Sequence, residues 1–258
     1  FSKKDIIKFC EIGVGHLVKK KLIKKEFLAK MEMNGNFNKS NNKQFSVQNA
    51  LPDYILSKCY QNFGCLGTGN TFVELHKITK DYEKKIKLNK FYVFIHSGLS
   101  ESYLTKFYSP RWGLHGKSFL PFEKEKWNFF SKHIFDKETI EVKKNFFPSS
   151  SKFFSLNSDK YDGRLYMAGM NYLCNISTAN RIHHGIIIKN YLEKSFKIKN
   201  FKLVLDNIHD SIKREKYKGK NFYFHRHGAA PVYESKNNNL FVIPSKPGGE
   251  ILLGKVVK

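Results

Sequence analysis

The stretch GRLYMAGMNYLCNISTANRIHHGIIIKNYLEKSF spans residues 163–196 and carries the strongest secondary-structure signal in the chain. Apolar residues recur in it every three or four positions, which is the spacing of an amphipathic helix. Asn180 and Arg181 place polar groups within its apolar side, and the planar guanidinium of Arg181 can bind phosphate or carboxylate. His183 and His184 are expected at the surface. The sequence therefore predicts one long helix over residues 163–196.

The rest of the chain mixes helical and strand-like patterns. The predicted elements are a buried-strand pattern at 5–20, helices at 24–33 and 51–61, a surface loop at 34–44, and strands at 90–98, 202–208, 221–225 and 239–243. Residues 110–160 are rich in Phe, Lys and Ser and give no assignment. We therefore expect an α+β fold.

The charge of the chain is unbalanced. Its 258 residues contain 46 Lys and Arg against 22 Asp and Glu, a net charge of +24, while 41% hydrophobic residues are enough to build a core. Such an excess of positive charge favours a polyanionic partner, most often nucleic acid. The alternative is a lysine-rich proteome in which solvated surfaces become basic without a partner.

The cysteines and apolar runs limit the cellular context. Cys10, Cys59, Cys65 and Cys174 form no CxxC pair, so they favour reduced thiols in an intracellular compartment over a zinc ribbon. The apolar runs are too short for a membrane span, so no membrane partner is expected. The chain begins with Phe1, so we expect a processed or trimmed N-terminus, with a mitochondrion or the cytoplasm as the compartment.

Three histidines follow predicted strands. His96, His209 and His225 each stand where an apolar stretch ends and polar or glycine residues begin. Imidazole can ligate transition metals or act as a covalent nucleophile, so a shared pocket is one interpretation. Three separate structural histidines are the other.

Two glycine-rich segments could approach a phosphate. GCLGTGN at 64–70 can present backbone N–H groups to an anion, although no Walker-type lysine follows it. IPSKPGGEILLG at 243–254 forms a second such segment. On its own the first segment is better explained by a tight turn, and a plain hairpin explains the second equally well.

Taken in order, these segments resemble the RtcB-type RNA ligases, which join RNA ends in tRNA splicing and RNA repair. The matching pieces are EIGVGH (11–16), GTGNTFVEL (67–75), HSGLS (96–100), MNYLCNISTANR (170–181), DNIHDSI (206–212), HRHGAAP (225–231) and IPSKPGGEILLG (243–254). The resemblance covers residues 5 to 255, so it implies a single domain, 1–258, of mixed sheets with helices packed around a central His-rich pocket. It also implies that the N-terminus and the C-terminal tail of the family pattern are missing or truncated.

The resemblance assigns roles to individual residues. In the family a histidine attacks GTP, the guanylate passes to an RNA 3′-phosphate, and a 5′-hydroxyl then displaces GMP, with two manganese ions organising the phosphates. His225 corresponds to the nucleophile. The other assignments are Glu11, His96 and His209 to metal, Asn70, Glu74, Ser245 and Gly248 to the nucleotide, and Arg181, Arg226 and Lys246 to RNA.

The departures from the family pattern concern the metal ligands. Glu11 replaces the ligand aspartate, Val14 the bridging cysteine, and Thr71 a ligand histidine. Valine has no donor atom and a threonine hydroxyl is a poor substitute for imidazole, so a two-metal site of the usual kind is not expected.

The preferred hypothesis is a degenerate, catalytically inactive RtcB-like protein with no cofactor. It would bind ribosomal RNA or tRNA through its basic surface, as a structural component of a ribonucleoprotein such as an organellar ribosome. A divergent active ligase that uses manganese and GTP is the first alternative. A regulatory partner of a ligase or of a translation factor is the second.

Overall fold

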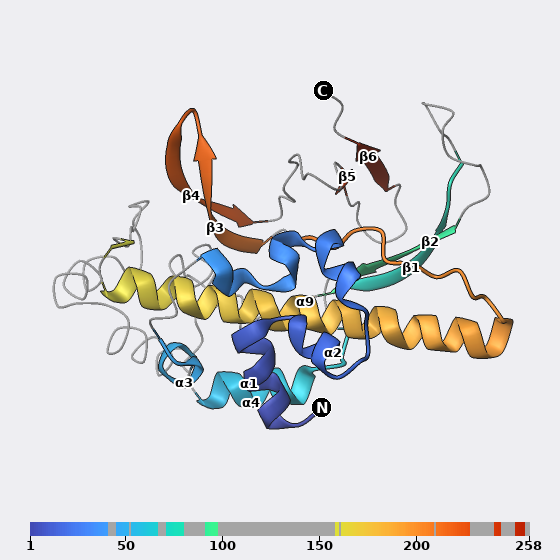
Figure 1. Ribbon diagram of the computed structural model, residues 1–258, viewed down its shortest axis with the longest axis horizontal. Helices are drawn as coiled ribbons and strands as arrows, with labels where there is room; N and C mark the ends of the chain where they lie inside the picture. Colours follow the sequence, from blue (N-terminus) through green and yellow to red (C-terminus); the bar gives the residue numbers. More distant parts are fainter. Residues whose placement is uncertain are drawn as a thin grey trace, which may run out of the picture.

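The computed structural model describes residues 1–40, 45–51, 53–66, 71–79, 91–97, 158–159, 161–208, 210–227, 240–243 and 251–255 of the chain. Its dominant element is the helix α9, Tyr161–Phe196, whose 36 residues confirm the long helix predicted over 163–196. N-terminal helices and two of the strand pairs contact α9 (Figure 1). No helix within these ranges is both long enough and apolar enough to cross a membrane.

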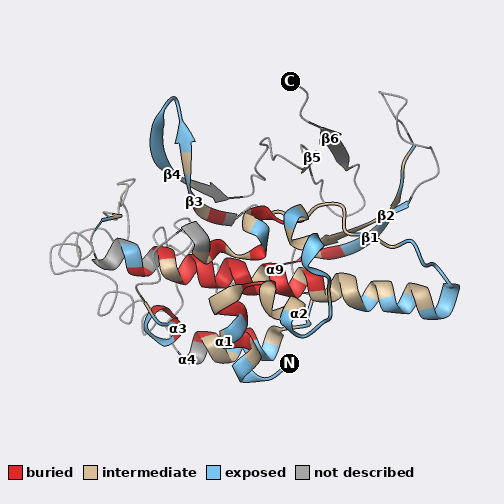
Figure 2. Ribbon diagram, viewed as in Figure 1, coloured by how far each residue is buried: buried red, intermediate tan, exposed pale blue. Residues whose placement is uncertain are grey.

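The middle of α9 is enclosed on all sides. Every residue from 170 to 176 is buried, whereas the helix becomes mostly half-buried or exposed after Ile182 (Figure 2). A helix that is apolar on one stripe only would expose its opposite side, so neighbours must cover the full circumference here. The α9 helix is therefore the central support of the structure, and its C-terminal third extends beyond the core.

The N-terminal segment is helical, which corrects the strand pattern predicted at 5–20. It forms α1, Lys3–Ile12, and α2, Gly15–Lys19. Ser2 and Asp5 make a capping box at the start of α1, and Ile6, Phe9 and Cys10 bury one helical face. Short apolar runs do not distinguish a strand from a buried helix, and the glycines that suggested a broken strand instead end α1 at Gly13.

Short helical turns connect the N-terminal helices to the first strand. They are the 3-10 helices η1 (Lys25–Lys30), η2 (Glu32–Gly35) and η3 (Phe37–Ser40), then α3 (Val47–Ala50) and α4 (Asp53–Asn62). The α4 helix confirms the helix predicted at 51–61. The helix predicted at 24–33 is present only as 3-10 turns, because Met31 and Asn36 adopt extended backbone conformations between and after them.

The described strands form antiparallel pairs. They are β1 (Phe72–Lys77) with β2 (Phe91–His96), β3 (Asp210–Tyr217) with β4 (Lys220–His227), and β5 (Leu240–Ile243) with β6 (Leu252–Lys255). The strands predicted at 90–98, 221–225 and 239–243 are confirmed as β2, β4 and β5. The α+β class is thus confirmed, but the described sheets are antiparallel rather than mixed.

The strand predicted at 202–208 is wrong. Among the described residues its one ladder contact is an isolated parallel bridge between Asp206 and Met31, and the strand β3 begins later, at Asp210. Leu203 packs against the core and Ile208 is buried, so this apolar pattern reflects packing rather than strand pairing. Residues 202–208 therefore do not form the strand that was expected to end at His209.

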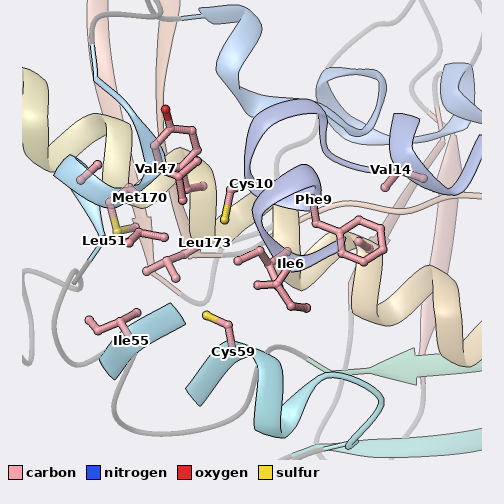
Figure 3. Close-up of a cluster of buried hydrophobic side chains, with 14 of the residues drawn as sticks. Ile6, Phe9, Cys10, Val14, Val47, Leu51, Ile55, Cys59, Met170 and Leu173 are labelled. Carbon is pink, nitrogen blue, oxygen red and sulfur yellow. The ribbon is translucent and has the colours of Figure 1, made fainter. Parts of the chain in front are cut away.

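The core lies between α1, α3, α4 and the middle of α9 (Figure 3). Its buried side chains include Ile6, Phe9, Cys10, Val14, Val47, Leu51, Ile55, Cys59, Met170 and Leu173. Burial raises the pKa of both the Cys10 and the Cys59 thiols. These cysteines therefore act as small apolar core residues.

Candidate functional site

The EIGVGH segment spans the end of α1 and the start of α2. Glu11 binds the ammonium group of Lys8 at 2.6 Å, and 41% of its side chain is exposed. Val14 is fully buried and packs within the core cluster (Figure 3). The position that the resemblance assigns to a bridging cysteine is therefore occupied by an apolar core residue.

Gly13 lets the EIGVGH segment pass close to Gly35 of the η2 turn. Gly13 has a φ of 57° and a ψ of −142°, and the Val14 amide donates a hydrogen bond of 2.9 Å to the Gly35 carbonyl. A Cβ at Gly13 would lie 1.9 Å from the carbonyl oxygen of Gly35. The crossing therefore requires glycine at position 13.

Buried asparagines on α9 hold backbone groups at the end of α1, at the start of η3 and just after α4. The Asn175 side chain accepts from the Phe37 amide at 2.7 Å and donates to the Cys10 carbonyl at 2.8 Å. Five residues farther along α9, Asn180 accepts from the Gly64 amide at 2.7 Å and donates to the Cys65 carbonyl at 3.0 Å. Asn180 thus fixes the start of the glycine-rich segment 64–70 against α9.

Arg181 joins two segments that carry predicted metal ligands. Its Nε and one terminal nitrogen donate to the two carboxylate oxygens of Asp206, at 2.8 and 3.1 Å, and another hydrogen bond of 3.2 Å reaches the carbonyl of Ser97. Only 12% of the Arg181 side chain is exposed. Burial would lower the pKa of this guanidinium, but the attraction of Asp206 raises it. Arg181 therefore ties the residue after His96 to the segment that precedes His209.

A second buried ion pair fixes the base of β3. Glu32 accepts from the Lys213 ammonium group at 2.8 Å and from the Ile208 amide at 2.9 Å. Both side chains of the pair are buried. Glu32 also donates its backbone amide to the Asp206 carbonyl, so η2, the segment 206–208 and β3 form one connected unit.

The β1–β2 pair places Glu74 and His96 on one face. Phe72 is paired with His96 and Glu74 with Phe94, so Glu74 and His96 are diagonal neighbours. His96 packs on the Phe72 ring with centroids 5.2 Å apart. Glu74 binds His76 at 2.8 Å, a contact that the sequence did not predict.

His183 is half-buried rather than at the surface. Its ring stacks on Phe63 with centroids 5.6 Å apart. Burial, followed by the neighbouring His184, lowers the pKa of His183. This histidine therefore belongs to an aromatic cluster with Phe1 and Phe63.

The remaining predicted residues are described in part or not at all. His225 and Arg226 lie in β4, opposite Ile212 and Ser211 in the register, and their side chains are outside the described structure. Asn70, His209, Ser245, Lys246 and Gly248 lie outside the described residues. The His-rich pocket therefore stays a prediction.

The described donor set does not fit a two-metal centre. Val14 contributes no donor atom, and the Glu11 carboxylate is bound to Lys8. Within the described ranges, no three His, Cys, Asp or Glu side chains are grouped closely enough to hold a metal ion. We therefore derive no catalytic step through manganese.

The sequence pointed to Arg181 but not to Asp206, its partner, nor to the buried pair of Glu32 and Lys213. Asp206 lies in the DNIHDSI segment, and Glu32 lies between two methionines. The residues around each acid do not indicate which cation it pairs with. Buried carboxylates require a paired cation, so an isolated acid within an apolar stretch was the available signal.

Comparison with known proteins identifies the ancestry of this arrangement. No curated protein matches the chain. The family described as tRNA-splicing ligase RtcB matches residues 1–251. That range contains nearly the whole chain, including the EIGVGH segment, α9 and the hairpin that carries His225. The chain therefore belongs to the RtcB family of RNA ligases.

Proposed function

We propose that this RtcB-family protein binds RNA and no longer ligates it. The observation that carries the proposal is the burial of Val14 in the apolar core, at the position corresponding to a bridging metal ligand. A role as a structural component of a ribonucleoprotein, for example an organellar ribosome, fits a protein that keeps the fold without the chemistry. Ribosomal RNA or tRNA would be the partner.

The changed ligands bear on the first chemical step. Attack of a histidine on GTP brings a nucleophile toward a polyanion, and metal ions normally neutralise the phosphate charge. The isopropyl group of Val14 cannot replace a thiolate, and Glu11 points its charge at Lys8. The guanylylation step would therefore lack its electrostatic support.

Incubation with radiolabelled GTP and manganese is expected to leave the protein unlabelled. Gel electrophoresis after denaturation detects a covalent guanylate directly, and an active ligase of the family serves as the positive control. A labelled band that disappears in a His225→Ala variant would contradict the loss of chemistry.

RNA binding is expected to persist and to weaken steeply with salt. Lys and Arg side chains that bind phosphates release counterions, so the logarithm of the binding constant falls linearly with the logarithm of salt concentration. An Arg226→Ala, Lys246→Ala double variant should flatten that slope by about one unit for each phosphate that the variant no longer binds. Arg181 is kept in this variant because its guanidinium is bound to Asp206.

The matched control removes two exposed cations elsewhere. A Lys19→Ala, Lys21→Ala double variant removes the same charge from the α2 region, where both side chains are exposed. Equal weakening of RNA binding in both double variants would indicate a general basic coat. Negligible RNA affinity at moderate salt would refute the RNA-binding role and favour a regulatory protein partner.

A divergent active ligase is the second candidate. It is favoured by Glu74, His76 and His96, which stand on one face of the β1–β2 pair. A single manganese ion with Glu11, His96 and His209, together with GTP, would be its cofactor set. The GTP-labelling experiment separates this candidate from the first.

A single domain over residues 1–258 is part of the proposal. The contacts of α9 with α1, α3, β2 and β3 support it, because they join elements that are spread from residue 3 to residue 217.

A further inference from the structure

The hairpin of β3 and β4 projects from the body of the protein (Figure 1). Its base is fixed, because Ser211 is fully buried and Lys213 is paired with Glu32. From residue 216 to residue 223 every side chain is exposed. The outer half of this hairpin thus stands in solvent on a rigid base.

The turn at its tip is tight and regular. Tyr217 pairs with Lys220, which leaves Lys218 and Gly219 as a two-residue loop with φ values of 45° and 79°. Two successive positive φ values are the mark of a type I′ turn, whose twist matches that of the strands. The side chains near the tip are therefore held in a fixed register.

Aromatic rings gather on one face of this outer half. Tyr217 and Phe222 are 53% and 45% exposed. Their ring centroids lie 6.4 Å apart, and Phe224 lies 6.3 Å from Phe222 on the same face. Three rings gathered on one face of a projecting hairpin form the kind of apolar group that marks an interaction surface.

Exposed positive charge lies on both faces of this outer half. By the alternation of side chains along the strands, Lys220 shares the face of the rings, whereas Arg214 and Lys216 lie on the opposite face. Arg214, Lys216, Lys218 and Lys220 are all exposed, and Lys218 lies 5.4 Å from the centre of the Tyr217 ring. Residues 216–227 contain no Asp or Glu. Glu215 is the one acidic residue of the segment 214–223, and it binds Lys213 at 3.2 Å. The partner of this surface is therefore expected to be both anionic and able to stack on flat rings.

We infer that the outer half of the β3–β4 hairpin, residues 214–223, binds single-stranded RNA by stacking bases on Tyr217 and Phe222 while the lysines bind phosphates. The inference rests on the RNA-binding function proposed above and assigns that function a surface away from the predicted pocket. Unpaired bases offer their flat faces, and stacking on aromatic side chains tolerates any sequence. Paired bases in a duplex cannot stack on these rings, so duplex RNA would be bound only through contacts between the lysines and its phosphates.

The test separates stacking from charge. A Tyr217→Ala, Phe222→Ala variant removes the rings and keeps every lysine. Its matched control is Tyr191→Ala, Phe196→Ala on α9, because those rings are 60% and 61% exposed and also contact each other edge to face. Binding of labelled oligoadenylate and of an RNA duplex is measured over a range of salt concentrations, after melting curves verify that each variant is folded.

The ring variant should bind the single strand at least about ten-fold more weakly, with an unchanged salt slope and unchanged duplex affinity. A Lys216→Gln, Lys218→Gln, Lys220→Gln variant should instead flatten the single-strand slope by about two units. Its control, Lys194→Gln, Lys197→Gln, Lys199→Gln, removes three exposed lysines near the end of α9 and should leave the slope close to that of the parent.

Four results would overturn the inference. If the Tyr217→Ala, Phe222→Ala variant bound single-stranded RNA as tightly as the parent protein, the hairpin would be assigned to a protein partner instead. Stacking would also be refuted if the α9 control lost as much single-strand affinity as the ring variant. The same holds if the ring variant lost as much affinity for the duplex as for the single strand. A parent protein that binds no RNA would refute the proposed function itself, whereas the other three results would refute only the hairpin.

Discussion

An Arg181→Met variant is expected to unfold with a free energy about 3–5 kcal/mol lower than the parent. Methionine keeps the apolar stem of Arg181 but leaves the carboxylate of Asp206 without its cation, and only 7% of the Asp206 side chain is exposed. An uncompensated charge at such a position is strongly destabilising. Urea denaturation followed by circular dichroism measures the decrease in stability.

Two comparisons isolate the ion pair from the rest of the site. An Arg181→Met, Asp206→Leu double variant should lose less stability than Arg181→Met alone, because no buried charge remains. Lys189→Met breaks an ion pair of 2.9 Å with Glu193 on the partly exposed part of the same helix, and its effect should stay within about 0.5 kcal/mol. A decrease in stability in Arg181→Met no larger than that in Lys189→Met would refute the structural role of the pair.

A Gly13→Ala variant is expected to lose about 3–5 kcal/mol of folding stability. The backbone at position 13 has a combination of φ and ψ that L-residues rarely adopt. In addition, the new methyl group would overlap the carbonyl oxygen of Gly35, at 1.9 Å. Because that carbonyl accepts from the Val14 amide, moving it away breaks a buried hydrogen bond.

Gly15 supplies the matched control within the same segment. Nothing lies within 4 Å of a Cβ added there, and Gly15 is the first residue of α2. Gly15→Ala should therefore raise the stability by up to about 1 kcal/mol, because alanine loses less backbone entropy in a helix. Thermal melting of the two variants side by side gives opposite shifts if the described crossing is correct, and equal shifts if it is not.

The long helix could be predicted from the sequence, whereas the elements packed on it could not. Over residues 163–196 the apolar spacing is repeated often enough to exclude a strand. The segment 5–20 contains only short apolar runs between glycines, and its helix depends on the cap at Ser2. The apolar segment 202–208 meets the core without strand pairing, so its composition indicates burial but not conformation.

The candidate site shows the same division. His96 and Arg181 were found because their residue types and neighbouring motifs are local features of the sequence. Their partners are not local: Arg181 meets Asp206 across 25 residues, and Glu32 meets Lys213 across 181 residues. Pairings of that kind are set by how the chain closes on itself, and no local pattern encodes them.

The burial of α1 against the middle of α9 also constrains how the chain folds during synthesis. The first partners of Ile6 and Phe9 on α9 lie more than 150 residues later in the sequence. At a translation rate of roughly 5–20 residues per second, the apolar face of α1 waits on the order of ten seconds before those partners leave the ribosome. Until then the apolar face of α1 is exposed to solvent in the nascent chain. Docking of α1 on α9 is also slow, because it closes so long a loop. The arrangement that encloses the middle of α9 in the finished protein therefore leaves the apolar face of α1 without its partners while the chain is still growing.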